Sequence, residues 1–230
     1  MIHGERLVDD TPHIRVSLAD VELPNQVRFT QYVFRMRRCA MTVVLDDTGE
    51  RVLLMRRHRF IVDRWVWELP GGYVDDGEDS AAAAAREVEE ETGWRPRKTE
   101  FVMSCQPLIG NADYPQDLYL ARGAELVGEP DADETAEVRW VPVDETPEMI
   151  APGVILGAIT IIGVQSQSII SNGPCPPRPS PALSAQREHR VPAATVHRTK
   201  ILINRMHSLK TGGPPRCYQH RRRPLTIHPT

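Results

Sequence analysis

The stretch AAREVEEETGW, residues 84–94, concentrates four glutamates within about two turns of a predicted helix. Glu87, Glu90 and Glu91 stand at positions i, i+3 and i+4 and share one face, whereas Glu89 points elsewhere. Like charges at this spacing destabilise a helix. Carboxylate oxygens are also ligands of Mg²⁺, which completes its shell with water and substrate phosphates. The pattern therefore has two interpretations, a solvated acidic face or a site for a divalent cation.

The elements around this stretch are expected to hold it in place. A helix is predicted over residues 79–92, because Ala81–Ala85 favour helix and Gly93 supplies a stop. The run Pro70-Gly71-Gly72 predicts a sharp turn with bare backbone just upstream. Strands are predicted at 39–45, 51–56, 100–105, 117–121 and 136–142, with short strands in 13–36 and an interrupted helical segment at 144–164.

The spacing from Gly72 to Trp94 reads G-x5-E-x7-R-E-U-x-E-E-x-G-U, where U is a bulky apolar residue. This pattern resembles the Nudix box at every fixed position. The last position is usually aliphatic in that family and is Trp94 here, which keeps the apolar bulk. The resemblance implies a Nudix hydrolase with an α/β/α sandwich around a mixed β-sheet. It favours the metal-site interpretation of the acidic helix.

The resemblance also implies roles for the residues of the box. Glu87 and Glu91 are expected to be the principal Mg²⁺ ligands, and Glu90 a further ligand or a helper, with Mn²⁺ as an alternative metal. Glu78 is expected to join the metal and water network, and the carbonyl of Gly71 is a further candidate ligand. Such carboxylates at one site relieve their mutual repulsion when cations bind.

The expected reaction is hydrolysis of a nucleoside diphosphate linked to another moiety. Arg86 is predicted to orient the glutamates by ion pairing. The family's proton-abstracting carboxylate often precedes a late strand, and ETAEVRW fits that region, which points to Glu134 as general base. The alternatives are that Glu134 belongs to an ordinary acidic loop and that Glu90 or Glu91 is the base.

The flanks of the box resemble the ADP-ribose pyrophosphatase branch, in LLMRRHRF followed by WVWELPGGYVDDGE. That resemblance makes Arg59 a candidate for contact with substrate phosphate or ribose, and it gives Pro107 weaker support as a substrate-site residue. The segment ADVELPNQVRF resembles an N-terminal strand region that often assists dimerisation, so a homodimer is predicted. The alternatives are a nucleoside triphosphate pyrophosphohydrolase and a non-catalytic nucleotide-binding Nudix module.

The composition divides the chain into two kinds of sequence. From Ser171 onward there are eleven basic residues and one acidic residue, Glu188, whereas the remainder carries a net charge of −13. This division predicts a disordered Pro/Arg/His-rich tail at 169–230. The resemblance implies a Nudix domain at 39–168, preceded by an N-terminal strand region at 1–38. The tail is either an extension that binds nucleic acid or acidic partners electrostatically, or the product of an altered reading frame.

The sequence also indicates where the protein works. It has no run of about 18 apolar residues, so no membrane span is predicted. Its N-terminus has acidic residues and no apolar segment of a secretory signal. The four cysteines are scattered and form no CxxC pair, which favours a reducing compartment. A cytoplasmic protein is therefore predicted, and the resemblance implies a small-molecule nucleotide substrate.

Overall fold

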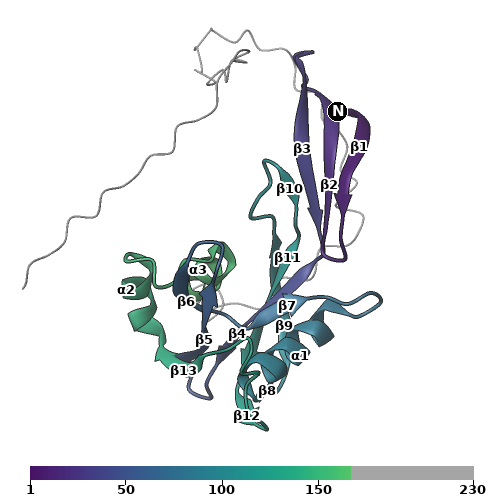
Figure 1. Ribbon diagram of the computed structural model, residues 1–230. Helices are drawn as coiled ribbons and strands as arrows, with labels where there is room; N and C mark the ends of the chain where they lie inside the picture. The colour runs from purple at the N-terminus through teal and green to yellow at the C-terminus, as the bar shows by residue number, and fades with distance from the viewer. Residues whose placement is uncertain (167–230) are drawn as a thin grey trace, which may run out of the picture. The chain divides into compact units, whose positions relative to one another are not determined.

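The computed structural model describes residues 1–166, so the prediction for the tail at 169–230 lies outside the described residues. Within residues 1–166, no helix is long and apolar enough to cross a bilayer. The elements, labelled in Figure 1, are β1 (Ile2–Asp10), β2 (Ile14–Glu22), β3 (Arg28–Met36), β4 (Cys39–Leu45), β5 (Arg51–Arg59), β6 (Arg64–Glu68), β7 (Gly71–Tyr73), α1 (Ser80–Thr92), β8 (Trp94–Pro96), β9 (Thr99–Cys105), β10 (Ala112–Asp113), β11 (Gln116–Arg122), β12 (Ala124–Leu126), β13 (Glu137–Pro142), the 3-10 turn η1 (Val143–Glu145), α2 (Thr146–Ile150) and α3 (Ala158–Gln165).

The central sheet has seven strands. Their order is β13-β5-β4-β11-β9, with β6 paired to β5 and β7 paired to β4. β4 and β11 run parallel, and the other neighbours run antiparallel, so the sheet is mixed. All seven residues of β4 are buried. A central strand covered on both faces reads as a continuous apolar run, which is why CAMTVVL shows no alternation.

Helices cover both faces of the central sheet (Figure 1). On one face, Ala84 of α1 packs with Tyr119, and Val88 of the same helix packs with Leu53. On the other face, Ile159 of α3 belongs to the largest apolar cluster. This arrangement confirms the predicted α/β/α sandwich around a mixed sheet. A two-stranded sheet of β8 and β12 lies beyond the end of α1.

Helix α1 begins and ends close to the predicted bounds. The side chain of Asp79 accepts hydrogen bonds from the backbone N–H groups of Ala81 at 3.0 Å and Ala82 at 3.4 Å. Gly93 ends the helix with a φ of +73°, a conformation that favours glycine. Between these ends, small alanines allow a close approach to the sheet, which brings the helix carboxylates near the strand ends.

The remaining predicted strands agree with β9, β11 and β13 to within one residue at either end. β5 continues to Arg59, three residues beyond the prediction, because β6 pairs with its charged end from Met55 onward. The predicted helical segment at 144–164 is η1, α2 and α3. The extension of β5 matters for the site, since it places two arginines on a rigid strand.

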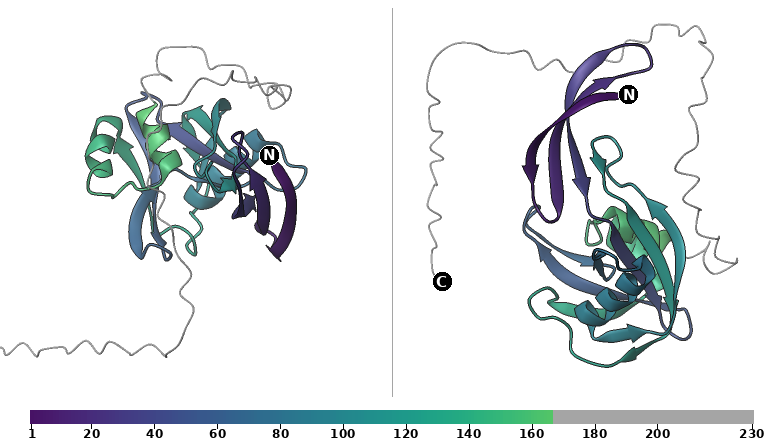
Figure 2. Two further views of the ribbon diagram at one scale, coloured as in Figure 1. Left: turned by 90° about the horizontal axis from the view of Figure 1, so that it is seen from above. Right: turned by 90° about the vertical axis from the view of Figure 1, so that its right-hand side faces the viewer.

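The N-terminal strands form a separate sheet in the order β1-β2-β3-β10, which Figures 1 and 2 show extending away from the central sheet. β2 and β3 pair without a break from Ile14–Met36 to Glu22–Arg28, on either side of the break predicted at Pro24-Asn25. All nine residues of β1 are exposed. Within the predicted strand region at 1–38, individual strands were predicted only from residue 13 onward, because the mixed charged and apolar residues of β1 follow no strand alternation.

Candidate active site

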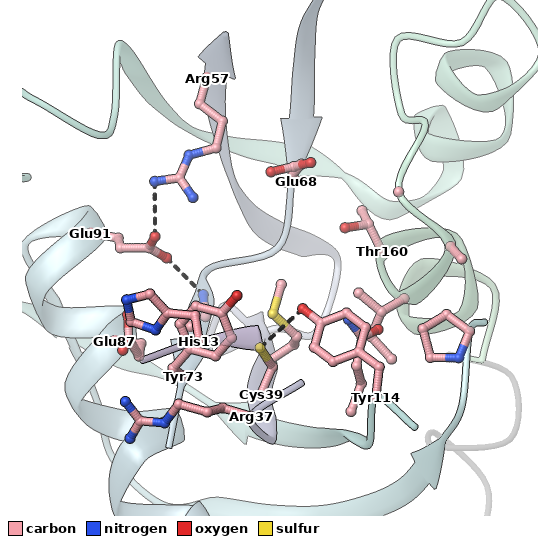
Figure 3. Close-up of a pocket in the computed structure, with 18 of the residues that line it drawn as sticks. His13, Arg37, Cys39, Arg57, Glu68, Tyr73, Glu87, Glu91, Tyr114 and Thr160 are labelled. Carbon is pink, nitrogen blue, oxygen red and sulfur yellow. Dashed lines mark hydrogen bonds and ion pairs between the residues drawn. The ribbon is translucent and has the colours of Figure 1, made fainter. Parts of the chain in front are cut away.

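A cavity of about 660 Å³ opens between α1, the sheet and the start of α3 (Figure 3). The predicted site residues that line it are Arg59, Gly71, Arg86, Glu87, Glu91, Pro107 and Glu134. Glu78 and Glu90 do not line this cavity, but both contact Arg86, which does. The fold therefore brings together residues that lie up to 75 positions apart in the sequence, from Arg59 to Glu134.

Arg86 binds three of the four predicted metal-site glutamates. Its Nε lies 2.9 Å from Oε1 of Glu78, and its Nη1 lies 2.8 Å from Oε1 of Glu87 and 2.9 Å from Oε2 of Glu90. Its Nη2 also donates to the carbonyl of Tyr73 at 3.2 Å. The hydrogen bond with Arg86 holds the pKa of Glu78 below its usual range. This geometry suits the orienting role predicted for Arg86, which stays a prediction.

Glu91 is held differently and is the most buried of the box glutamates, with 4% of its surface exposed. Its Oε2 accepts a hydrogen bond from the Gly71 N–H at 2.7 Å, and its Oε1 lies 3.1 Å from Nη2 of Arg57 (Figure 3). Burial raises the pKa of Glu91 to about 8, although the charge of Arg57 and the hydrogen bond from Gly71 act in the opposite direction. A buried carboxyl of this kind gains from a nearby cation.

Gly72 explains why the first position of the box requires glycine. A Cβ atom at residue 72 would lie 2.5 Å from Oε2 of Glu87 and 2.6 Å from its Cδ. The carboxylate of Glu87 therefore fills the space that a side chain would take. Burial raises the pKa of Glu87, and the hydrogen bond from Arg86 opposes this effect. Glu87, whose side chain is partly buried, and Glu91, which is buried, thus both pack against the Gly71-Gly72 backbone.

Arg57 is a site residue that was not predicted from the sequence. Its Nη2 lies 2.5 Å from Oε2 of Glu134, its Nε donates to the Glu134 carbonyl at 3.2 Å, and Glu91 lies on its other side. Strand alternation could have found it: Leu53, Met55 and Arg57 share one face of β5, and Leu53 packs with the helix residue Val88. The missing information was that β5 continues as far as Arg57.

The predicted substrate residues also lie at the cavity. Arg59 donates from Nε and Nη2 to Glu68 at 2.6–3.1 Å, so its guanidinium is already positioned. Pro107 and Tyr114 both line the cavity, and the hydroxyl of Tyr114 lies 3.2 Å from Sγ of Cys39 (Figure 3). The ring of His13 stacks on Tyr73, with centroids 4.9 Å apart. These aromatic residues on the wall of the cavity were not predicted as a group.

The carboxylates fit a divalent cation by their chemistry and by their burial. Hard cations prefer oxygen ligands, and the carboxyls of Glu87 and Glu91 with the backbone carbonyl of Gly71 supply only oxygens. In the described part of the chain, no group of three His, Cys, Asp or Glu side chains is drawn together in coordination geometry. The carboxylates are instead paired with two arginines, Arg86 and Arg57.

Comparison with known proteins agrees with the geometry in indicating a hydrolase family. Residues 36–155 match the model of the NUDIX domain. The chain is 48% identical over 162 residues to CMP-5'-(N-acetyl-N-hydroxy-3-aminopropyl)phosphonate hydrolase of Streptomyces rubellomurinus, covering 70% of this chain and 78% of that protein. It is 31% identical over 163 residues to ADP-ribose pyrophosphatase of Mycobacterium tuberculosis, covering 69% and 78%.

A solved structure shares the fold. The crystal structure of an ADP compounds hydrolase superimposes with a TM-score of 0.65 at 19% identity, covering 75% of this chain and 95% of that one. The family model spans just over half of the chain and contains the whole box from Gly72 to Trp94. The chain therefore belongs to the Nudix family, as a pyrophosphatase that acts on nucleotide-linked small molecules.

Proposed function

We propose that this protein hydrolyses the anhydride of a nucleoside diphosphate linked to a second moiety, with Mg²⁺ as cofactor and Mn²⁺ as the alternative. The products are a nucleoside monophosphate and a phosphorylated second fragment. The observation that carries this proposal is the pair of carboxyls of Glu87, partly buried, and Glu91, buried, packed on bare glycine backbone in a cavity that also contains Arg59. Carboxylates for a cation and arginines for a polyphosphate are what this reaction needs.

Glu87 and Glu91 would hold the cation, together with the carbonyl of Gly71. Glu90 and Glu78 would complete the network around it, and Arg86 would keep three of these glutamates in fixed orientations. A bound Mg²⁺ supplies neutralisation of the diphosphate charge and a water of lowered pKa. The chain's own contribution is to fix these oxygens before substrate arrives, because Arg86 and the Gly71 N–H already restrain them.

Glu134 is our candidate for the general base. Its side chain lines the cavity and is 57% exposed, so it can reach a water on the substrate side. It faces Glu91 across Arg57. In this proposal Glu134 takes the proton from the attacking water, which contributes typically 10²–10⁴-fold to the rate of such a step.

ADP-ribose or a related nucleotide sugar is the substrate that the resemblance predicts, and the identity with the ADP-ribose pyrophosphatase supports it. In this role Arg59 contacts the phosphates or the ribose, and Pro107 lines the same cavity. A CMP-linked phosphonate is the second candidate, favoured by the 48% identity with the hydrolase of Streptomyces rubellomurinus. Both substrates join a nucleoside monophosphate to a second phosphorus acid through one anhydride bond.

A substrate panel tests this proposal. The full chain with Mg²⁺ is assayed against ADP-ribose, other nucleoside diphosphate sugars, a CMP-linked alkylphosphonate and deoxynucleoside triphosphates. Formation of AMP from ADP-ribose with the highest kcat/KM supports the first candidate, and preferred release of CMP supports the second. Preferred release of pyrophosphate from a triphosphate would contradict both and would support a nucleoside triphosphate pyrophosphohydrolase. Binding of all substrates without turnover would support a non-catalytic module.

The proposal includes a homodimer built on the N-terminal strand region, residues 1–38. Large apolar side chains of this region are exposed, among them Ile2, Leu7, Val8 and Tyr32. In this proposal these side chains contribute to a contiguous apolar patch, and such a patch often marks an interaction site. Sedimentation of the full chain tests the assembly: a mass near twice 25.9 kDa is expected, and a monomer at micromolar concentration would contradict it.

The remaining parts of the proposal concern the domain boundaries and the cellular location of the protein. We assign residues 39–168 to the Nudix domain and 169–230 to a tail without a catalytic role. A chain ending at residue 168 should therefore keep full activity. We also place the protein in the cytoplasm, which the free thiols of Cys39 and Cys105 support, because free thiols persist in reducing compartments.

A further inference from the structure

The acid cluster of the site is divided between two arginines. Arg86 pairs with the glutamates at 78, 87 and 90, as the box pattern leads one to expect. Arg57 pairs with the two that remain, Glu91 at 3.1 Å and Glu134 at 2.5 Å. The side chain of Arg57 is only 11% exposed, so its charge acts on its partners with little screening by water.

The three members of this second group are not equally fixed. Arg57 projects from the interior of β5, and Glu91 is anchored by its helix and by the Gly71 N–H. Glu134 lies in the Asp131–Thr135 turn and is 57% exposed. When the charges of this group change, Glu134 is therefore the member that can move.

Arg57 must also affect the binding of a cation. A divalent ion bound by Glu91 would share that carboxylate with the guanidinium, whose Nη2 already lies 3.1 Å from Oε1. Like charges repel strongly in a partly buried site. The positive charge of Arg57 thus stabilises the metal-free carboxylates and opposes the ion that would replace it.

We propose that Arg57 is a positioning residue that takes the place of a cation between Glu91 and Glu134, and that binding of the divalent ion weakens its hold on Glu134 and releases that carboxylate into the cavity. This inference rests on the metal dependence in the proposed function. In this account the release of Glu134, the candidate base, depends directly on whether the metal site is occupied. Arg57, an arginine outside the box, thereby has a role in the site.

The proposal is tested by calorimetric titration of the metal-free full chain with Mg²⁺. The titration measures the affinity for Mg²⁺ at a pH above the pKa of Glu91. Arg57→Gln removes the charge and should tighten Mg²⁺ binding about tenfold, equal to about 1.4 kcal/mol. Arg95→Gln is the matched control. Arg95 pairs with Glu89, which lies on the exposed face of α1, the helix that also contains Glu91, so this variant should leave the affinity for Mg²⁺ unchanged. Unchanged or weaker Mg²⁺ binding by Arg57→Gln would overturn the proposal.

Thermal melting separates this role from a merely structural one. Arg57→Gln should lower the melting temperature of the metal-free protein more than that of the Mg²⁺-saturated protein. An equal loss in both states would show that Arg57 only stabilises the fold, and would overturn the proposal. If neither the wild-type protein nor Arg95→Gln binds Mg²⁺, the proposed function is overturned, and this inference with it.

Hydrogen exchange of the wild-type protein provides a test that needs no variant. The amides of the Asp131–Thr135 turn should exchange faster when Mg²⁺ is added, because Glu134 loses its hold on Arg57. The segment around Arg95 serves as the internal reference, and its exchange should not change. Exchange of the turn that stays the same or slows with Mg²⁺ would contradict the release of Glu134.

Discussion

Replacement of Glu91 by glutamine is the perturbation whose outcome follows most fully from the geometry. Glutamine has the same size and can still accept the hydrogen bond from the Gly71 N–H. It cannot carry the negative charge that burial opposes. Because burial raises the pKa of Glu91 from 4.5 to about 8, the folded metal-free protein binds a proton there that the unfolded chain has lost. Its free energy of unfolding therefore falls as the pH rises from 4.5 through 8.

The size of the effect can be bounded. The difference between the two pKa values of Glu91 lowers the free energy of unfolding at alkaline pH by at most roughly 5 kcal/mol. Glutamine recovers only part of this, since it remains a buried polar group and gives up its ion pair with Arg57. We expect a gain of about 2 kcal/mol in the metal-free protein, which raises the melting temperature of a domain of this size by about 5 °C.

The assay is thermal melting across pH, with and without Mg²⁺. Above the pKa of Glu91, metal-free Glu91→Gln should melt at a higher temperature than the wild type, and Mg²⁺ should raise only the wild-type melting temperature. Turnover by the variant should be largely abolished. Glu89→Gln is the control, because Glu89 is paired with Arg95 on the exposed face. A variant that melts below the wild type at alkaline pH, or keeps the full Mg²⁺-induced rise, would refute this reasoning.

Four further substitutions have distinct expected outcomes. Gly72→Ala should fold normally but lower kcat/KM by at least about 100-fold, because its Cβ would displace only the flexible carboxylate of Glu87; melting and kinetics together check this. Gly71→Ala should instead fail to fold or melt far lower, since its Cβ would lie 2.3 Å from a backbone oxygen; soluble yield and circular dichroism measure it. Glu134→Gln should reduce kcat about 100-fold at saturating Mg²⁺ with less effect on KM, and a near-normal kcat would move the base to another glutamate. Gly93→Ala should cost at least about 2 kcal/mol of stability in denaturant unfolding, because residue 93 has a φ of +73° and a backbone oxygen also lies 2.3 Å from its Cβ position.

The parts of the fold that the sequence predicted are those with local signals. The helix over 79–92 has a capping aspartate, five alanines and a terminal glycine, and its bounds differ from α1 by one residue. β4 has an unbroken apolar run and is a buried central strand. In both cases neighbouring residues contain enough information to specify the element.

The parts that were missed depend on pairing between distant segments. β1 has no alternation of its own, and its hydrogen bonds come from β2 in an exposed sheet. Arg57 could be placed in the site only once β5 was known to extend beyond residue 56, a consequence of its pairing with β6. The stacking of His13 on Tyr73 likewise joins segments 60 residues apart. Long-range contacts of this kind leave no local pattern.

The most direct measurement is hydrolysis in water labelled with heavy oxygen, with ADP-ribose and a CMP-linked alkylphosphonate as substrates. We predict that the nucleoside monophosphate appears only when Mg²⁺ or Mn²⁺ is present, and that one labelled oxygen enters a phosphorus-containing product, with Glu91→Gln inactive under the same conditions. Cleavage that proceeds equally without metal, or that continues in Glu91→Gln, would contradict the assignment of the acidic helix as the cation site of a phosphoanhydride hydrolase.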